Sequence, residues 1–405
     1  MKYTELKRKL RELVQERLDY AREYTDDEVE ETIDNILLEQ EQLRMYPVEL
    51  RRRLKKELFD SLRRLDILQI FVEDSSVTEI MINGLEHVFI EQGGRVRELD
   101  VTFDSLEKLQ DVIQQIVAGC NRVVNEASPI VDARLSNGSR VNIVMNPIAL
   151  NGPIVTIRRF PDKPITMEQL IQQHSISLEA AQLLEKLVRA RYNIIISGGT
   201  GSGKTTFLNV LSDYIPQEER VITIEDSAEL QLQGLPNLVR LETRNSNVEG
   251  CNEITIRDLI RSSLRMRPDR IIVGEVRGAE AIDMMQCLNT GHDGSMSTGH
   301  ANSAGDMLAR LENMILMGME LPLLAIKQQI VSGVDIIVHL GRLRDKSRRV
   351  LEITEVCGCE NGEIRLNPLY EFEEAGQDAG GNIVGRLQKK GVLLHENKLK
   401  AAGLS

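Results

Sequence analysis

The eight residues from Gly198 to Thr205 constrain the fold of this chain more than any other segment. They read Gly-Gly-Thr-Gly-Ser-Gly-Lys-Thr, a complete phosphate-binding loop of the form G-x-x-x-x-G-K-T. The apolar, β-branched run at 192–197 predicts a buried strand before the loop, and residues 206–214 suit a helix after it. This order predicts an α/β domain that binds a polyphosphate; the alternative is a glycine-rich turn without a ligand.

The residues of this loop have separate expected roles. The glycines let successive backbone N–H groups face a polyphosphate, Lys204 reaches its β- and γ-phosphates, and the Thr205 hydroxyl binds Mg²⁺. The residues expected to hold the nucleotide are Gly198, Gly199, Thr200, Gly201, Ser202, Gly203, Lys204, Thr205 and Thr206.

Two acidic positions are candidates for the chemistry of hydrolysis. Glu275 ends the hydrophobic run at 270–277, where a second nucleotide motif normally carries an Asp; here Gly274 precedes the Glu, so Glu275 is expected to serve the metal, the water or both. Glu225 ends another predicted strand and is the candidate that polarises the attacking water. The alternative for Glu275 is an ordinary exposed acid at a strand end.

The residues around these acids add further candidates. Asp226 and Glu229 are placed to help hold Mg²⁺, although Asp226 or Ser227 is equally suited to cap a helix. Residues 290–302 are rich in small and polar side chains and contain two histidines, whose spacing does not indicate zinc. His300 is the candidate γ-phosphate sensor, because an imidazole can donate to a phosphate oxygen, and His292 has a structural alternative.

Arginines are the remaining candidates, because a guanidinium can stabilise charge on a transferring phosphoryl group. Arg277 follows Glu275 closely, and four more arginines lie at predicted strand ends of a preceding domain: Arg134, Arg140, Arg158 and Arg159. For each of them the alternative is an exposed surface arginine without a ligand.

The chain divides into four segments by composition and periodicity. We expect a helical extension at 1–68, an α+β domain at 74–160, a largely parallel sheet covered by helices at 165–340, and a β-containing tail at 341–405. The helical extension is either a solvated amphipathic segment that docks on a neighbour or a surface for a partner. A hairpin is predicted in the tail, turning near Asn361-Gly362.

Composition excludes some functions and indicates a compartment. The net charge is −12, aromatic residues make up 3% and Trp is absent, which disfavours a nucleic-acid surface. The five cysteines are few and odd in number, so we expect reduced thiols. No window of about 18 apolar residues and no signal-peptide core are present. We therefore expect a cytoplasmic protein that meets a membrane only through partners.

Several motifs together resemble one family. The phosphate loop, the acidic box at 225–229, the Gly-Glu-Val-Arg strand end and the Thr-Gly-His-Ala-Asn box resemble the ATPases of type II and type IV secretion systems. Residues 77–84, 132–135 and 157–160 are similar to the CpaF branch, which powers Tad-type pilus assembly. The resemblance covers about 70–370 and implies a RecA-like P-loop ATPase domain that follows the α+β domain and the helical extension.

The resemblance also implies function, ligands and partners. It implies a cytoplasmic ATPase, peripheral to the cytoplasmic membrane, that forms a hexameric ring and drives an inner-membrane pilus or secretion platform. ATP and Mg²⁺ would lie on Lys204 and Thr205, Glu225 and Glu275 would be catalytic, and His300 would be the sensor. Arg134 and Arg140 would reach the nucleotide from the first domain. Two alternatives remain: a nonhydrolysing, nucleotide-bound scaffold of a secretion complex, and a RecA-like nucleic-acid motor.

Overall fold

A computed structural model of the chain describes residues 3–404, apart from 19–21, 23, 121, 161–163 and 245–252. The expectation of a reduced thiol at Cys251 lies outside the described residues; the other four cysteines form no disulfide in the part that is described. The chain separates into two compact units, Met1–Asp162 and Lys163–Ser405. Each unit has its own hydrophobic core and is described by itself.

Helices form the first part of the N-terminal unit. The elements are α1 (Tyr3–Arg17), α2 (Asp26–Glu39), η1 (Glu41–Met45), α3 (Val48–Arg63), η2 (Asp66–Leu68) and α4 (Gln69–Glu73). The three long helices bury one apolar face each, through residues such as Leu10, Ile33 and Leu58. The capping box predicted at the start of α2 is confirmed, because Thr25 and Glu28 bond each other's backbone N–H groups.

An antiparallel sheet with one helix follows in the same unit. Its strands are β1 (Val77–Asn83), β2 (His87–Gln92), β3 (Arg95–Leu99), β4 (Ile130–Arg134), β5 (Arg140–Val144) and β6 (Ile154–Arg158), in the order β3-β2-β1-β6-β5-β4. Helix α5 (Leu106–Ala118) packs its apolar face on this sheet. The side chain of Ser105 caps α5 by accepting from the Lys108 N–H at 3.2 Å.

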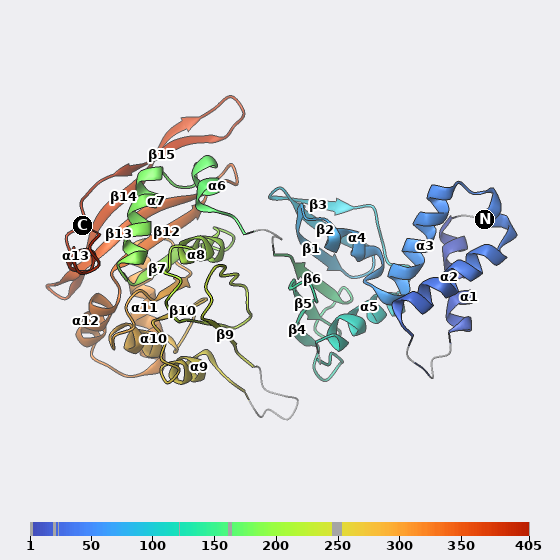
Figure 1. Cartoon of the computed structure of the whole chain (residues 1–405), viewed down its shortest axis with the longest axis horizontal. Coiled ribbons are helices and arrows are strands. Elements are labelled where there is room, and N and C mark those ends of the chain that lie inside the picture. The colour runs from blue at the N-terminus through green and yellow to red at the C-terminus, as the bar shows by residue number, and fades with distance from the viewer. Residues whose placement is uncertain are drawn as a thin grey trace. The chain divides into compact units, whose positions relative to one another are not determined.

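A nine-stranded sheet forms the centre of the C-terminal unit (Figure 1). Its strands are β7 (Ile194–Gly198), β8 (Val221–Glu225), β9 (Leu238–Glu242), β10 (Arg270–Val273), β11 (Met296–Gly299), β12 (Ile336–Arg342), β13 (Arg348–Glu360), β14 (Glu363–Gln377) and β15 (Ile383–Lys389), in the order β15-β14-β13-β12-β7-β11-β10-β8-β9. The six strands from β12 to β9 are parallel, and β13, β14 and β15 continue the sheet antiparallel.

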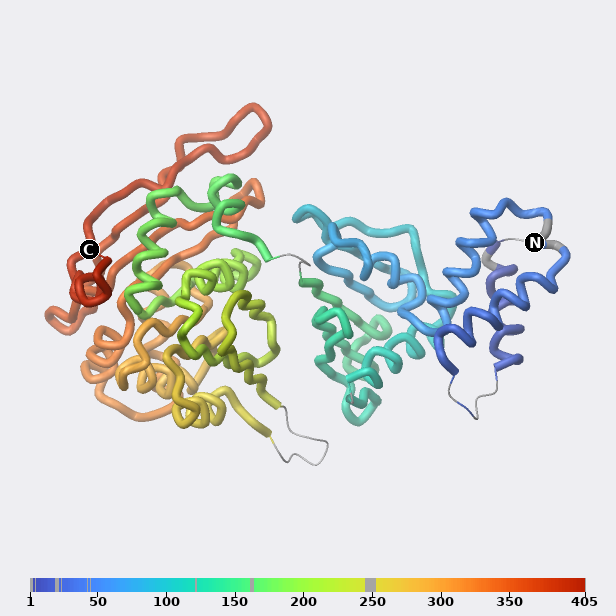
Figure 2. Tube along the Cα trace, viewed as in Figure 1, coloured from blue at the N-terminus to red at the C-terminus, as the bar shows by residue number. Residues whose placement is uncertain are grey.

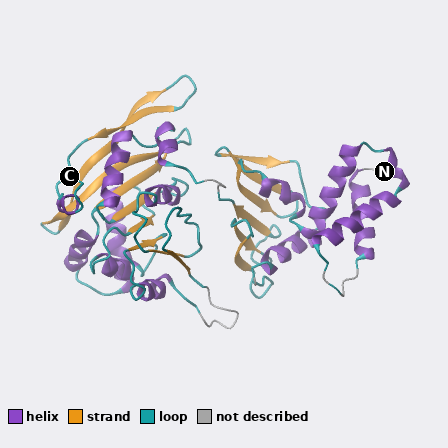
Figure 3. Cartoon of the chain, viewed as in Figure 1, coloured by secondary structure: helices purple, strands orange, loops and turns teal. Residues whose placement is uncertain are grey.

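Helices cover both faces of this sheet, as Figure 3 shows. They are α6 (Met167–Gln172), α7 (Leu178–Arg189) and α8 (Lys204–Ser212) on one face, and α9 (Ile256–Ser263), α10 (Ala281–Leu288), α11 (Ala304–Gly318) and α12 (Leu323–Gly333) on the other. Strand β7 serves both cores, because Ile194 and Ile196 face the first set of helices and Ile195 faces the second. A continuous apolar strand is what a parallel sheet buried on both sides requires.

The expected boundary between 340 and 341 falls inside β12, so the tail continues the central sheet. The predicted hairpin is confirmed: Glu360 pairs with Glu363, and Asn361 and Gly362 between them have φ of 52° and 81°. The trace in Figure 2 ends in a short helix, α13 (Asn397–Ala401), in the C-terminal unit. Lys398 on this helix forms an ion pair with Asp335 at 2.7 Å.

Helices α11 and α12 together resemble a membrane span in length and composition. Among the described residues no single helix is long and apolar enough to cross a membrane, and the pair passes such a test only when taken together, across a bend of 119°. Both helices contribute to the core of the C-terminal unit, through residues such as Leu311 and Ile330.

A buried ion pair joins the two faces of the sheet near its amino-terminal edge. Arg270 on β10 is fully buried and donates to both carboxylate oxygens of Glu219, with one of the two bonds at 3.1 Å. It also donates to the carbonyl of Val188 on α7 at 2.7 Å. Removing one member of such a pair leaves an uncompensated charge in the protein interior.

We therefore expect Glu219→Ala to destabilise the C-terminal unit by about 3–5 kcal/mol, because Arg270 would remain buried without its counter-ion. Urea unfolding followed by circular dichroism measures this loss. Glu218→Ala changes an exposed neighbour and is the matched control, with an expected change within about 0.5 kcal/mol. Equal unfolding midpoints for the two variants would contradict the role given to the pair.

Candidate nucleotide-binding site

The phosphate loop joins the carboxyl end of β7 to the start of α8, as the sequence predicts. Gly203 is the residue before the helix and has φ +95°, and Gly201 has φ +71°. These left-handed conformations are open to glycine and turn successive N–H groups towards one point. A Cβ on Gly198 would lie 2.4 Å from the carbonyl oxygen of Leu340 on β12, so the loop also begins where no side chain fits.

Lys204 lies within the loop and is largely buried. Its Nζ donates to the carbonyl oxygens of Gly198 at 3.0 Å and Gly199 at 2.9 Å. The Ser202 hydroxyl donates to the same Gly199 oxygen at 2.8 Å. The ammonium group is thus held at the mouth of the loop, where a polyphosphate would meet it.

His300 connects the loop to the carboxylate of Glu275. It follows the end of β11, a strand that lies between β7 and β10. Its Nδ1 lies 3.4 Å from Lys204 Nζ, and its Nε2 lies 2.9 Å from Glu275 Oε1. The Arg277 guanidinium donates to the other Glu275 oxygen at 2.6 Å and lies 3.8 Å from an Asp226 oxygen. Five charged or polar side chains therefore meet at adjacent strand ends.

The environment of His300 favours a neutral imidazole. Burial, and then the positive charge of Lys204, lower the pKa of His300, while Glu275 opposes this shift. A neutral ring with the proton on Nε2 can accept from the Lys204 ammonium through Nδ1. The ring of His300 thus lies between the Lys204 ammonium and the Glu275 carboxylate.

Glu225 ends β8 and is nearly inaccessible to solvent. Its Oε1 accepts the backbone N–H groups of Glu229 and Leu230, both at 2.8 Å. Within the described part of the chain its Oε2 is buried without a hydrogen-bond partner. A Cβ on Gly274 would lie 2.9 Å from Glu225 Cγ, which explains why a glycine stands where the second nucleotide motif normally has an Asp.

Burial raises the pKa of Glu225 to about 7, against the opposing effect of its two backbone hydrogen bonds. A carboxyl group with such a pKa can accept a proton near neutral pH, as a general base must. Strongly shifted carboxyl groups at strand ends also mark functional sites more often than structural ones. The raised pKa is one sign that Glu225 is functional. The unpartnered Oε2 is a second sign, because this oxygen can still accept a hydrogen bond.

The residues present fit a nucleoside polyphosphate and a hard divalent cation. The loop offers a glycine cradle with a lysine ammonium at its mouth. Oxygen ligands suited to Mg²⁺ stand close by, in the Thr205 hydroxyl at the start of α8 and the Glu275 carboxylate at the end of β10. The assignment of either residue as a metal ligand stays a prediction.

Two expectations of the sequence are changed by the structure. Residues 226–237 form no helix, so neither Asp226 nor Ser227 is a helix cap, and the alternative reading of the acidic box is wrong. His292 lies before the start of β11 and His300 after its end, so the two histidines stand at opposite ends of one strand. His292 therefore does not belong to this cluster.

Three of the four arginines from the first domain form a row across its sheet. Arg134 on β4 is directly opposite Arg140 on β5, which is directly opposite Arg158 on β6. Arg159 differs, because its guanidinium donates to the backbone carbonyls of Asp74 and Val77 within its own unit. This bonding favours a structural role for Arg159, and nucleotide contacts by the other three stay a prediction.

Sequence reasoning missed three residues beside the loop. The His339 Nδ1 on β12 lies 2.9 Å from the hydroxyl of Ser197, and burial lowers the pKa of this imidazole. The Arg348 Nε on β13 donates to the carbonyl oxygen of Gly201 at 2.8 Å, and Arg342 lies close to the same glycine. The sequence signals for these residues were a histidine at the end of a predicted strand, His339, and the arginines that follow it at 342 and 348.

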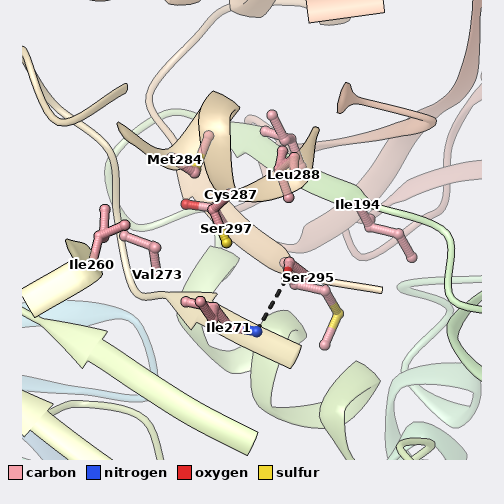
Figure 4. A pocket seen from close by; sticks show the side chains of 11 residues that line it. Ile194, Ile260, Ile271, Val273, Met284, Cys287, Leu288, Ser295 and Ser297 are labelled. Carbon is pink, nitrogen blue, oxygen red and sulfur yellow. Dashed lines mark hydrogen bonds between the residues drawn. The ribbon is translucent and has the colours of Figure 1, made fainter. Parts of the chain in front are cut away.

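An apolar cavity lies elsewhere in the same unit, between the sheet and helices α9 and α10 (Figure 4). Its lining includes Ile195 and Met296 besides the residues labelled in the figure. The dashed bond in Figure 4 joins the Ile271 N–H to the Ser295 hydroxyl at 3.0 Å. None of the predicted site residues lines this cavity, so it is a packing feature of the core.

The raised pKa of Glu225 predicts how stability depends on pH. In the unfolded chain this carboxyl ionises near pH 4.3, whereas in the native state it keeps its proton to about pH 7. The unfolded state therefore binds fewer protons between these values, and the free energy of unfolding falls as pH rises, by at most about 1.4 kcal/mol per pH unit. Glu225→Gln removes this contribution.

Urea unfolding of nucleotide-free protein from pH 5 to pH 8 measures the effect. The stability of the wild type should fall more steeply towards pH 7 than that of Glu225→Gln, and Glu218→Gln on the exposed surface should follow the wild type. Parallel curves for the wild type and Glu225→Gln would show that the Glu225 carboxyl has an ordinary pKa.

Comparisons with known proteins show the family of this chain. Residues 62–386 match the family described as "Type II/IV secretion system protein". The chain is 34% identical over 318 residues to a putative conjugal transfer protein of Mycobacterium tuberculosis (strain CDC 1551 / Oshkosh), covering 77% of this chain and 90% of that protein. It is 32% identical over 303 residues to the type IV secretion system protein VirB11 of Brucella suis biovar 1, covering 68% and 84%.

A solved structure shares the fold. The crystal structure of the pilus retraction motor PilT with bound ADP matches with a TM-score of 0.51 at 19% identity, over 84% of this chain and 88% of that chain. This likeness concerns the fold, while the family assignment rests on the sequence matches over most of the chain. By these sequence matches, the chain belongs to the type II/IV secretion system protein family.

Proposed function

We propose that this protein hydrolyses ATP and uses the reaction to drive a pilus-assembly or secretion machine at the cytoplasmic membrane. The observation that carries the proposal is the placement of His300 between Lys204 and Glu275. It brings the phosphate loop after β7 close to a carboxylate that follows β10, with β11 between these two strands. A loop that only binds nucleotide has no need of such a placement. Membership of a secretion family indicates the kind of machine that the hydrolysis would drive.

The chain's own residues divide the work of hydrolysis. The loop N–H groups and Lys204 bind and orient the polyphosphate, which is most of what phosphoryl transfer asks of a protein. Arg277 orients the Glu275 carboxylate by donating to one of its oxygens. Glu225 accepts a proton from the attacking water, since its pKa is close to neutral. Mg²⁺ held by Thr205 and Glu275 would neutralise charge on the phosphates.

The quaternary arrangement belongs to the same proposal. We propose a homohexameric ring of the CpaF-like branch, acting on an inner-membrane platform protein, with Arg134, Arg140 and Arg158 as nucleotide contacts. The pairing register supports a shared role, because it places the three arginines side by side on one face of β4, β5 and β6. The CpaF-like motifs at 77–84, 132–135 and 157–160 support the choice of branch.

Lys204→Ala tests whether this loop is the active site. The variant loses the cation that meets the β- and γ-phosphates, so ATP hydrolysis should fall to background and the affinity for ATP should also fall. Phosphate release by the purified protein measures turnover. Lys186→Ala, on the exposed surface of α7, should hydrolyse ATP like the wild type. A wild type that binds ATP but releases no phosphate would instead support the scaffold alternative.

Glu275→Gln should separate nucleotide binding from chemistry. The amide keeps the shape of the side chain but loses the charge that orients water or metal, so kcat should fall about 100-fold while ATP still binds. Steady-state kinetics and a binding titration are the two measurements. Glu320→Gln, an exposed acid on the same unit, is the control. If affinity and turnover fall by the same factor, Glu275 acts in binding alone.

A further inference from the structure

The strands β12 and β13 bring two arginines face to face at the edge of the phosphate loop. Strand β12 pairs with β7 up to Gly198 and then continues beyond it, so that its last residue, Arg342, extends past the start of the loop. Antiparallel pairing places Arg342 directly opposite Arg348 on β13. Directly opposite residues share one face of a sheet, and two like charges in this position repel each other.

Both arginines lie against the loop itself. The Arg348 Nε donates to the Gly201 carbonyl oxygen at 2.8 Å, and its Cδ lies 3.5 Å from where a Cβ on Gly203 would stand. The Arg342 Nη1 lies 3.7 Å from the corresponding Cβ position of Gly201. Two guanidinium side chains therefore lie beside the glycines that would cradle a polyphosphate, within reach of an anionic ligand held there.

The turn between the two arginines is fixed by other strands. Asp345 accepts the N–H groups of Ser347 at 2.9 Å and of Ile383, at the start of β15, at 2.7 Å. Arg344 forms a two-bonded ion pair with Glu374 on β14. The hairpin is thus braced by β14 and β15 independently of any ligand, and its arginines are preorganised.

We propose that Arg342 and Arg348 serve the nucleotide site from within the same unit. Arg342 contacts the polyphosphate of the nucleotide. Arg348 is a positioning residue, which holds the Gly201 carbonyl outward so that the loop N–H groups stay turned towards the phosphates. This inference rests on the proposed function, because it assumes that the loop binds a nucleotide.

The different bonding of Lys204 and Arg348 supports this division of roles. The Lys204 ammonium group donates to two carbonyl oxygens of the loop. A bound phosphate would compete with these oxygens for the same ammonium group. Arg348 approaches the loop from another strand, through a carbonyl and not through the N–H groups that face the ligand. Its bond can persist when the nucleotide binds, so it stabilises the binding conformation in both states.

Binding of fluorescent ADP to the full chain tests the proposal, with inorganic pyrophosphate as a competitor. We expect Arg342→Ala and Arg348→Ala to weaken ADP binding by about tenfold or more, the size of a lost charged hydrogen bond. Arg342→Ala should weaken pyrophosphate binding by the same factor. Lys346→Gln removes one positive charge from the exposed turn of the same hairpin and keeps the Arg344–Glu374 ion pair, so it should stay within about twofold of the wild type.

Conservative variants distinguish contact from positioning. Arg342→Lys should recover most of the lost affinity, because a point charge suffices for a phosphate, whereas Arg348→Lys should not, because lysine lacks the Nε that meets Gly201. Thermal unfolding without nucleotide should give the same midpoint for all variants, so that lost affinity is not lost folding. If an alanine variant does unfold earlier, its lysine counterpart carries the comparison.

Three results would overturn the proposal. One is wild-type ADP affinity in Arg342→Ala and Arg348→Ala while Lys204→Ala has lost binding, which would leave the proposed function intact. Another is an equal loss in Lys346→Gln, which would show a general effect of charge. The third is a wild-type protein that binds no ADP, which would overturn the proposed function as well.

Discussion

The contact between the first loop residue and the next strand sets the geometry of the site. Gly198 ends β7 so close to the Leu340 carbonyl on β12 that a Cβ would stand 2.4 Å from it. Because β7 is buried on both faces and paired on both edges, the end of this strand cannot shift. The loop must therefore turn within a few residues, and left-handed glycines such as Gly203 make that turn.

The remaining side chains meet at the loop as a consequence of strand order. Parallel strands end at the same edge of a sheet, so the residues that follow β8, β10 and β11 arrive beside the residues that follow β7. Glu225, Glu275 and His300 come from three separate parts of the sequence, and their proximity follows from this edge. The close approach of His300 to both Lys204 and Glu275 then requires only that β11 lie between β7 and β10.

The sequence predicted most elements of the site because their signals are local. The loop is a contiguous motif, and each catalytic candidate directly follows an apolar run that reads as a strand. What could not be predicted depends on register between distant segments. Arg342 and Arg348 become neighbours through a hairpin whose pairing no local pattern specifies, and the tail joins the central sheet by the same pairing. The burial of Glu225 likewise depends on helices and strands distant in the sequence.

The position of Glu225 shows how stability is exchanged for chemistry at this edge. A carboxyl group with a buried, unpartnered oxygen weakens the fold, since burial of its charged form is unfavourable. Two features accommodate this carboxyl group. Its Oε1 accepts two backbone N–H groups, and the glycine at 274 leaves space beside its Cγ. The buried carboxyl group departs from the usual rules of packing, and two local features, the backbone donors and Gly274, accommodate it. Such a departure indicates a functional requirement. We propose that this requirement is a proton acceptor at neutral pH beside a polyphosphate, which a carboxyl group with a pKa of about 7 can supply.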